Sequence, residues 1–485
     1  MVSGDAPRRL HPATVLTSII RGAPSTLLGL PAILAVTSDF NLLYVIGLAI
    51  VATLVAGFVR YLAWRRFTYA LTGDAVVIES GLLSRNRRTI PFDRVQDVDI
   101  EQQLLARIFG LAKVSLETGG AGKDEGALDS VSLAEAHRLR GVIRGRAAAA
   151  HHAEAAAAGE EAPAPVEGQV LFAMPFPRVL LWGLFNFSLV WLAVIFGALQ
   201  YVDDFVSFDV WDWLSENGDA EAREIAAGLA VGAWVSLALL FAALGVVAGV
   251  VRTVLRDFGF TLTDEGGRFR RVRGLVTHTE AVIALKRVQL ALVENGLVRR
   301  TLGWSGLKLQ TLGGSGDASG RQEAAPFARD AEIDALLAPL GWARPDPAEL
   351  RQVSRGHVWR ALARLVGLPL VAILIGGIFL PPVLFALTLL APLLAVAMLR
   401  RRFHRYGLPG DRLFVQRGVL TRQMWIVPVR NVQAVSIRRS WLQRRLGTAS
   451  VLPDTAGAGV LSDPTVHDIR LGDAWALAGE LRTRR

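Results

Sequence analysis

The sequence predicts a membrane protein built from three units, each with two transmembrane helices followed by a compact β-rich domain that a C-terminal helix closes. Two observations predict this class. The chain of 485 residues is 52% hydrophobic with a mean hydropathy of +0.37, and its apolar residues are gathered in blocks. In addition, one motif occurs three times in the same register, which is typical of a chain assembled from repeated structural modules.

The repeated motif begins with a glycine and two aliphatic residues, continues to a Val-Gln pair, and then reaches a second glycine and a threonine. The offsets between these positions are the same in all three copies. We call the following twelve positions the signature residues: Gly81, Gln96, Gly110, Thr118, Gly274, Gln289, Gly303, Thr311, Gly418, Gln433, Gly447 and Thr455. A structural role is favoured, with glycines supplying a special backbone conformation and glutamines satisfying buried backbone groups. Binding of a ligand or partner by the glutamines is the alternative.

Six apolar blocks are each close to the ~20 residues that cross ~30 Å of hydrocarbon. They cover 15–37, 42–60, 178–200, 225–251, 357–380 and 383–399. They predict three helical hairpins over 15–60, 177–251 and 356–399, the second with an acidic external loop at about 201–224. A second block follows the first almost at once, so an uncleaved helix is favoured over a signal peptide.

Charge predicts the orientation of the hairpins. Arginines flank the hairpin ends on one side, at Arg8, Arg9, Arg21, Arg60, Arg65, Arg66, Arg178, Arg252, Arg256, Arg360, Arg364, Arg400, Arg401 and Arg402. The opposite side has almost no Lys or Arg, and its long loop is acidic. Because cytoplasmic loops carry the excess of basic residues, all three β-rich domains and both termini are expected in the cytoplasm, with the chain in the plasma membrane.

The β-rich domains are expected at 61–146, 252–342 and 400–485, after a cytoplasmic tail at 1–14. Short stretches of β-forming residues separated by turns, such as 75–80 and 432–437, predict antiparallel strands. Ser132, Asp330 and Asp473 stand where helix N-caps are expected, before helical patterns at 133–144, 331–340 and 474–481. The Ala, Glu and Pro-rich range 147–168 predicts a flexible linker.

These repeated units, each behind a membrane hairpin, resemble the bacterial PH-like domains of the YdbT type over nearly the whole chain. The resemblance is carried by Gly-Leu-Leu at 81–83, Arg-Val-Gln at 94–96 and Thr-Gly-Gly at 118–120, with their counterparts in the other copies. It implies three copies of the PH fold, seven strands capped by a helix. It also implies one candidate partner, a smaller PH-like membrane protein of the same family. The third copy departs from the pattern at Pro409 and over 453–457.

Basic residues close to the predicted spans suggest contact with anionic lipids of the inner leaflet. The candidates are Arg65, Arg66, Arg85, Arg87, Arg88, Arg400, Arg401, Arg402, Arg405, Arg438, Arg439, Arg444 and Arg445. Basic residues are concentrated in the third unit of a chain whose formal net charge is +10. Arg85, Arg87 and Arg88 form a basic hairpin tip of the kind that grips phosphoinositides in eukaryotic PH domains, but the other copies lack it. Nucleic-acid binding is disfavoured, since the domains are tethered to a membrane.

The sequence predicts no catalytic residue, cofactor or metal site. The chain has no cysteine, and its glycine-rich stretches lack the Lys-Ser/Thr of a phosphate loop. A transporter or channel is disfavoured because the predicted spans are apolar at their centres, apart from Asn186 and Ser188. The leading hypothesis is a non-enzymatic multi-pass protein that presents three PH-like modules to protein partners, with a role in envelope maintenance or stress resistance. An anionic-lipid sensor is the alternative.

Overall fold

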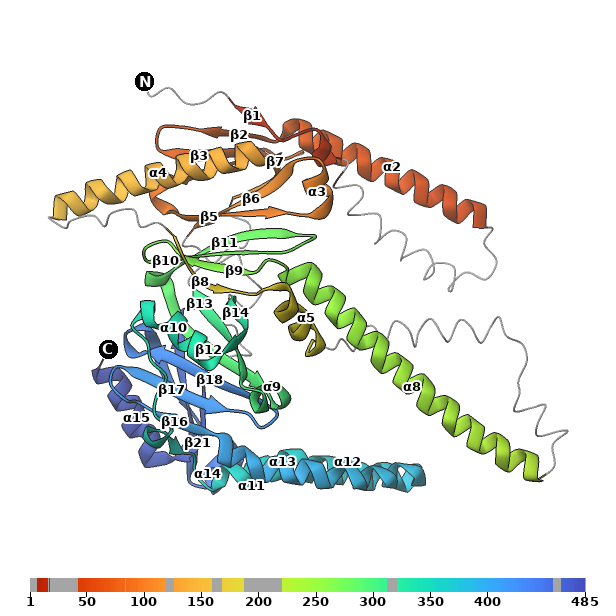
Figure 1. Cartoon of the computed structure of the whole chain (residues 1–485). Helices are drawn as coiled ribbons and strands as arrows, with labels where there is room; N and C mark the ends of the chain where they lie inside the picture. The colour runs from red at the N-terminus through yellow and green to blue at the C-terminus, as the bar shows by residue number, and fades with distance from the viewer. Residues whose placement is uncertain are drawn as a thin grey trace. The chain divides into compact units, whose positions relative to one another are not determined.

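The computed structural model describes residues 7–15, 17, 42–82, 84–118, 126–158, 168–186, 220–311, 321–456 and 464–484 (Figure 1). The chain divides into two compact bodies. A β-rich body comprises Met1–Phe172, Leu262–Arg271 and Thr279–Arg485, and a smaller, mainly helical body comprises Ala173–Thr261 and Val272–His278.

The described residues of each repeat form seven strands and a closing helix. Repeat 1 has β1 (Arg8–Arg9), β2 (Thr68–Leu71), β3 (Ala75–Ser80), β4 (Asn86–Pro91), β5 (Val95–Gln102), β6 (Leu111–Thr118), β7 (Ala127–Ser132) and α4 (Leu133–Ala158). Repeat 2 has β8 (Gln169–Ala173), β9 (Thr261–Asp264), β10 (Arg268–Arg273), β11 (His278–Ala284), β12 (Val288–Gly296), β13 (Trp304–Thr311), β14 (Arg321–Arg329) and α10 (Asp330–Leu337). Repeat 3 has β15 (Arg351–Gln352), β16 (Arg405–Gly407), β17 (Arg412–Arg417), β18 (Thr421–Pro428), β19 (Val432–Arg438), β20 (Thr448–Thr455), β21 (Val466–Arg470) and α15 (Leu471–Thr483). This matches the seven strands and one helix that the family resemblance implies.

The first strand of each repeat lies before the apolar segment rather than after it. β1 pairs with β2, and β15 pairs with β16, across the whole length of the intervening chain. In repeat 2, β8 is the neighbour of β9 in the same way. The predicted domains at 61–146, 252–342 and 400–485 therefore omit the first strand of each repeat, and the apolar segment lies in sequence between strands one and two.

The β-sheets are shared between consecutive repeats. The three C-terminal strands of repeat 1 and the four N-terminal strands of repeat 2 form one sheet, in the order β7-β6-β5-β11-β10-β9-β8. Repeats 2 and 3 form the second such sheet, in the order β14-β13-β12-β18-β17-β16-β15 (Figure 1). The antiparallel pairing of β12 with β18 runs from Ala291 opposite Ile426 to Gly296 opposite Thr421. Backbone hydrogen bonds thus join each repeat to the next.

The hydrophobic cores of repeats 1 and 3 differ in whether they include residues of another repeat. The first lies within repeat 1 and includes Val76, Val98, Val114 and Leu139. The second fills repeat 3 around the fully buried Trp425, and it also contains Leu290 and Leu292 from β12 of repeat 2. The face of β12 that carries these leucines therefore belongs to the core of the following repeat.

Helix termini follow the predicted caps in part. The Ser132 Oγ accepts a hydrogen bond from the Glu135 backbone N–H at 3.2 Å, so Ser132 caps α4 as predicted. By contrast, Asp330 is the first residue of α10, and Asp473 lies in the first turn of α15. The predicted flexible linker at 147–168 is helical up to Ala158, because alanine is the strongest helix former.

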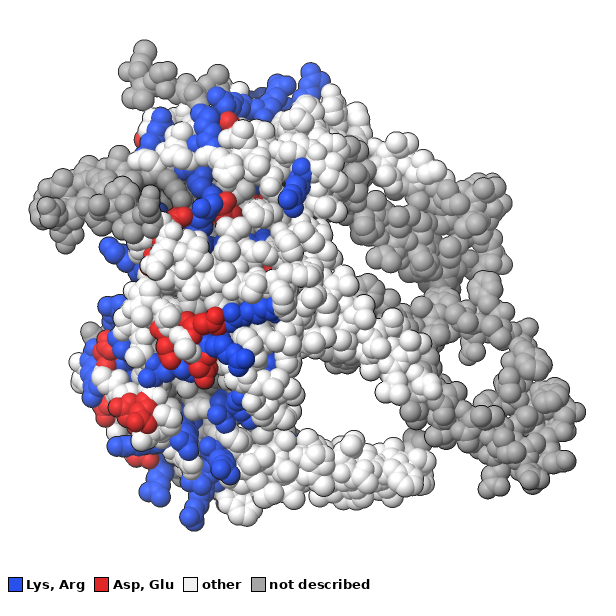
Figure 2. Space-filling model, in the orientation of Figure 1, with Lys and Arg blue, Asp and Glu red and all other residues white. Residues whose placement is uncertain are grey.

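Three described segments are long and apolar enough to span a membrane: Leu239–Asp257, Gly356–Phe379 and Pro381–Phe403. The last two follow one another, running through α11 (Gly356–Leu362), α12 (Leu368–Phe379) and α13 (Leu390–Phe403). The uncharged α12 appears white in Figure 2, whereas blue and red gather on the strand-rich repeats. α2 (Leu42–Arg66) covers the predicted block at 42–60. Most of the blocks at 15–37 and 178–200, Ser188 and the acidic loop lie outside the described residues.

In the helical body, α5 (Phe176–Leu184) packs closely on α8 (Ala220–Asp257). A Cβ added to Gly183 would lie 2.7 Å from the Val250 Cα, so only glycine permits this approach. Asn186, the polar residue predicted near a span centre, donates a hydrogen bond from Nδ2 to the Thr253 Oγ1 at 3.0 Å. Asp257 is buried and forms an ion pair with Arg273 at 3.1 Å. These two contacts pair four polar side chains of this body with one another.

The first glycine of the signature is required by the backbone. Gly81, Gly274 and Gly418 have φ of +117°, +110° and +108°. A Cβ at each would lie 1.8 Å from the carbonyl oxygen three residues further on. An L side chain at any of these three positions would therefore clash with the backbone of the turn.

Replacing Gly418 by alanine is expected to destabilise repeat 3 by about 3 kcal/mol, because strain at positive φ is added to a clash with backbone that cannot rotate away. Gly410→Ala is the matched control. Gly410 has φ +65° in the same repeat but nothing within 4 Å of its Cβ, so a loss of about 1 kcal/mol is expected. Pulsed hydrogen exchange of repeat 3 peptides across a urea titration of the purified full-length protein measures both. Equal losses would contradict the clash.

Candidate functional site

The signature glutamines and threonines mark one β-bulge in each repeat. Val95 pairs with Thr118, Val288 with Thr311 and Val432 with Thr455, and in each case the register shifts immediately after the valine. Gln96, Gln289 and Gln433 are the residues at this shift. In repeat 2, the Gln289 side chain donates to the Arg287 carbonyl oxygen at 3.2 Å. The signature glutamine and threonine thus mark the bend of the fifth strand of each repeat, which is β5, β12 or β19. Gly110, Gly303 and Gly447 follow the short helix after this strand, and their φ values are +64°, +72° and +63°.

The predicted basic residues are dispersed over several elements. Arg65 and Arg66 end α2, Arg85 precedes β4, Arg87 and Arg88 lie on β4, Arg400, Arg401 and Arg402 end α13, Arg405 begins β16, Arg438 ends β19, Arg439 follows it, and Arg444 and Arg445 lie on α14 (Trp441–Arg445). Several are committed to local contacts. Arg66 donates to the Leu82 carbonyl at 2.7 Å, and Arg401 donates to the Val353 carbonyl at 3.1 Å. Only Arg438 and Arg439 of this set line the pocket described next.

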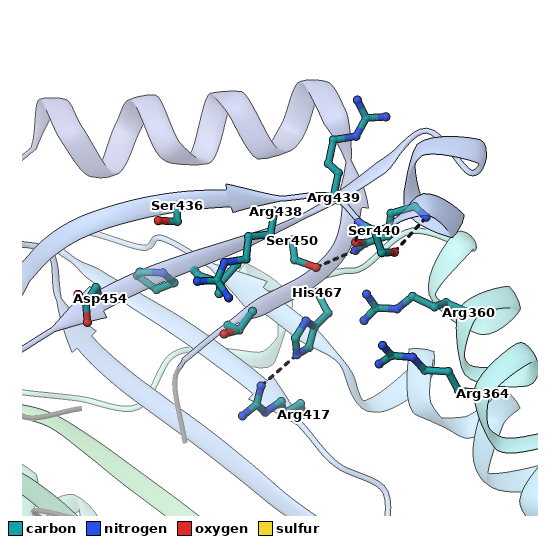
Figure 3. Close-up of a pocket in the computed structure, with 14 residues that line it drawn as sticks. Arg360, Arg364, Arg417, Ser436, Arg438, Arg439, Ser440, Ser450, Asp454 and His467 are labelled. Carbon is teal, nitrogen blue, oxygen red and sulfur yellow. Dashed lines mark hydrogen bonds between the residues drawn. The ribbon is translucent and has the colours of Figure 1, made fainter. Parts of the chain in front are cut away.

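A pocket of about 1010 Å³ lies in repeat 3 (Figure 3). It is lined by the start of the apolar segment Gly356–Phe379 and by the outer face of the sheet formed by β19, β20 and β21. Arg360 and Arg364 reach into it from the start of the span Gly356–Phe379. Arg417, Arg438 and Arg439 approach from the strands. Its remaining lining is mostly hydroxyl, amide and imidazole groups, with Asp454 as the one carboxylate: Ser436, Ser440, Gln443, Ser450, Leu452, Pro453, Asp454, Thr465 and His467. Five arginines facing one acidic residue make this pocket strongly cationic.

A buried carboxylate fixes one wall of the pocket. Asp468 is fully buried, and its Oδ2 lies 2.9 Å from the Arg360 Nε and 2.7 Å from the His357 Nδ1. Its Oδ1 accepts a hydrogen bond from the Gln443 Nε2 at 2.6 Å. Asp468 thus ties the start of the span to β21 and α14, and it holds Arg360 in place.

Arg364 and Arg438 are the pocket arginines with unused charge. Within the described residues, neither guanidinium group makes a hydrogen bond or an ion pair. Arg360 is held by Asp468, Arg439 donates to the Thr448 carbonyl oxygen at 3.3 Å, and Arg417 lies 4.2 Å from the centre of the Trp425 ring. These two guanidinium groups come from different elements of the pocket, Arg364 from the span and Arg438 from the sheet.

Histidines do not supply the positive charge of the pocket. Burial, reinforced by the charge of Arg417, lowers the pKa of His467 to about 3, so its imidazole is neutral at physiological pH. Burial also lowers the pKa of His404, which lies behind it with ring centres 5.8 Å apart. Burial alone would raise the pKa of Asp468, but the hydrogen bond from His357 and the charge of Arg360 outweigh it, so this pKa is lowered. Asp468 stays ionised, and the arginines supply the positive potential.

The chemistry of this site is that of anion binding. Guanidinium groups form paired hydrogen bonds with phosphate and carboxylate, and hydroxyl groups add donors. Within the described ranges, no group of three or more His, Asp or Glu side chains is arranged to hold a metal ion.

Sequence reasoning named four of the pocket arginines, Arg360, Arg364, Arg438 and Arg439, but gave no sign that they lie together. Arg360 and Arg364 were assigned to the flank of a span, and their spacing of one helical turn was the signal that both face the same way. Arg417 gave no local signal, since it ends a strand far from the span in sequence. The pocket arises from tertiary contacts between segments that are separated along the chain.

Comparison with known proteins agrees with the repeated architecture. The sequence model of the family described as "Bacterial PH domain" matches three times, at residues 25–147, 219–340 and 362–485. The UPF0699 transmembrane protein YdbT of Bacillus subtilis (strain 168) is 22% identical over 487 residues, which cover 96% of each chain. No solved structure matches.

Proposed function

This chain belongs to the bacterial PH domain family, and from that premise we propose that it is a multi-pass plasma-membrane protein whose third repeat binds anionic phospholipid headgroups. The three repeats and both termini face the cytoplasm in this proposal, and each repeat carries a helical hairpin inserted after its first strand. The positive-inside rule supports that orientation, because Arg360 and Arg364 lie at the start of one span and Arg400, Arg401 and Arg402 at the end of the next.

The observation that carries the proposal is the arginine-lined pocket in repeat 3. A phosphate between Arg364 and Arg438 would bring together the two guanidinium groups with unused charge, with Ser436 and Ser440 beside Arg438 as further donors. A lipid is favoured over a free anion because the pocket arginines of the span are expected at the level of the lipid headgroups. Arg360 and Arg364 lie in the first turns of a membrane span, where long basic side chains extend to the headgroup layer.

Native mass spectrometry of the detergent-purified full-length protein tests this proposal. After incubation with an equimolar mixture of phosphatidylglycerol and phosphatidylcholine, the wild type is expected to retain phosphatidylglycerol about tenfold more often. Arg364→Glu combined with Arg438→Glu should abolish that preference. Arg482→Glu is the matched control, because Arg482 is exposed in the same repeat but lies outside the pocket.

The outcomes separate the two sources of phosphate. Displacement of the lipid by millimolar inorganic phosphate would indicate a site for a free anion. Equal retention of both lipids by the wild type, or an equal effect of the control substitution, would contradict headgroup binding in this pocket.

Binding of another protein is the second candidate function. It is favoured by sheet edges that lack a neighbouring strand within the described residues. A smaller PH-like membrane protein of the same family is the partner that the resemblance suggests, and a role in envelope maintenance or stress resistance is an extension of it.

A further inference from the structure

A short helix and a turn meet at the junction of repeats 2 and 3. Strand β12 ends at Gly296, which pairs with Thr421 at the start of β18. The helix α9 (Leu297–Thr301) begins directly after Gly296. The turn between β17 and β18 ends at Leu420, directly before Thr421. The helix and the turn therefore lie at the same end of this strand pair.

Both segments expose aliphatic side chains. Leu297 and Val298 of α9 are 47% and 58% exposed, Leu302 directly after α9 is 51% exposed, and Leu420 of the turn is 62% exposed. We call these four residues the junction patch. Single exposed apolar residues are common on protein surfaces, but several on adjacent segments indicate a surface that meets another apolar phase.

The junction patch lies where the chain leaves a membrane-spanning segment. Phe403 is the last residue of α13 and of the apolar segment Pro381–Phe403. The Arg300 guanidinium of α9 lies 5.6 Å from the centre of the Phe403 ring. The guanidinium of Arg422, two residues after Leu420, lies 4.7 Å from the same ring centre. Both segments of the patch thus contact the end of this span, and the bilayer is the apolar phase next to them.

Positive charge surrounds this end of the span. Burial, and then the charges of Arg300 and Arg405, lower the pKa of the Arg422 guanidinium, so cationic groups are crowded here. Three more arginines, at 400–402, directly precede Phe403. Anionic lipid headgroups are attracted to such a cluster, whereas a protein partner would have to be both apolar and acidic to cover it. Apolar side chains beside basic ones are typical of segments that lie in the interfacial layer of a bilayer.

An exposed apolar residue recurs at the first position of this short helix in every repeat. Leu104 of α3 (Leu104–Ile108), Leu297 of α9 and Trp441 of α14 are the equivalent residues. They are 47%, 47% and 64% exposed. Tryptophan in particular is enriched at the interface between membrane and water. The exposure is therefore a property of this place in the repeat and not of one surface residue.

We propose that the junction patch inserts into the interfacial layer of the bilayer beside the end of α13, and so anchors the junction of repeats 2 and 3 to the membrane surface. The aliphatic side chains reach the boundary between headgroups and acyl chains, while Arg300 and Arg422 stay at the level of the headgroups. The proposal rests on the membrane hairpin proposed at 356–399, but it does not depend on headgroup binding in the pocket of repeat 3.

Fluorescence quenching by lipid tests this proposal, since the chain has no native cysteine and accepts a single label. A nitrobenzoxadiazole dye is attached to Val298→Cys or Leu420→Cys in the full-length protein. The protein is reconstituted into phosphatidylcholine vesicles whose acyl chains carry a doxyl quencher, so no anionic lipid is present for the pocket. The dye is expected to lose about half of its fluorescence at both positions. Trp475→Cys is the matched control, because Trp475 is 64% exposed on α15 and lies outside the patch. Its dye should be quenched by aqueous iodide instead.

A label in the span separates failure of the anchor from failure of the hairpin. Leu374→Cys lies in α12, within the apolar segment Gly356–Phe379, and its dye should be quenched by the doxyl lipid. Quenching at residue 374 but not at residues 298 and 420 would overturn the anchor and leave the hairpin intact. Absence of quenching at residue 374 would overturn the hairpin and the anchor with it. Equal quenching by the doxyl lipid at residues 298 and 475 would also contradict the anchor. A dye at residue 298 that neither the doxyl lipid nor iodide reaches would assign the patch to a protein contact.

Discussion

Replacing Glu280 by alanine is expected to destabilise the junction of repeats 1 and 2 by about 3–5 kcal/mol, because it leaves the buried Arg140 without a counter-charge. The Glu280 Oε1 on β11 lies 2.6 Å from the Arg140 Nη1 on α4, and the two side chains are 6% and 8% exposed. Arg270 also pairs with Glu280. Burial alone would raise the pKa of Glu280, but the hydrogen bond and charge of Arg140 outweigh it and hold this pKa below its ordinary value.

Hydrogen exchange of the full-length protein measures this effect where it occurs. Peptides from β5 and β11 should exchange much faster in Glu280→Ala, while peptides from β19 to β21 should be unchanged. The control is the double variant Arg140→Met with Glu280→Met, which replaces the ion pair by apolar groups of similar volume and should recover most of the protection. Unchanged exchange at β5 and β11 in the single variant would show that the ion pair does not hold the junction.

The local features of the fold could be predicted from sequence. A glycine was predicted to be needed at Gly418 because of the local backbone, and Ser132 was predicted to cap the helix that follows it. In both cases a few neighbouring residues were enough for the prediction. The three-fold register also fixed the number of repeats, which the family match confirms. These predictions succeeded because the interactions involved lie close together in the chain.

The long-range features could not be predicted in this way. β15 is two residues long, and it becomes a strand only because it pairs with β16 beyond two membrane-spanning segments. The continuation of β12 into β18 depends on contacts between different repeats. The pocket likewise combines Arg364 from a span with Arg438 from a strand, and neither residue's surroundings in sequence indicate the other. Non-local pairing leaves little trace in local composition.

Exchanging Asp468 for asparagine is expected to destabilise repeat 3 by about 3 kcal/mol, because Arg360 and His357 lose the one buried charge that they share. Asparagine is chosen because it removes the charge of Asp468 and leaves the backbone conformation unchanged. Asp468 has φ +57°, a left-handed conformation that Asp and Asn both tolerate. Pulsed hydrogen exchange of repeat 3 peptides across a urea titration gives the loss, and release of Arg360 should also weaken the preference for phosphatidylglycerol.

The pH dependence of this loss distinguishes a charge effect from a packing effect. The lowered pKa of Asp468 in the folded state means that its ionisation stabilises fully above the ordinary value of 3.8 and ceases to do so as the pH falls through the folded pKa. The difference between wild type and Asp468→Asn should therefore be constant above about 3.8 and shrink below it. Both proteins should also lose stability as the pH falls from 6.5 toward about 3, since His467 resists protonation only when folded. A difference that persists unchanged into acid would mean that Asp468 acts through packing alone.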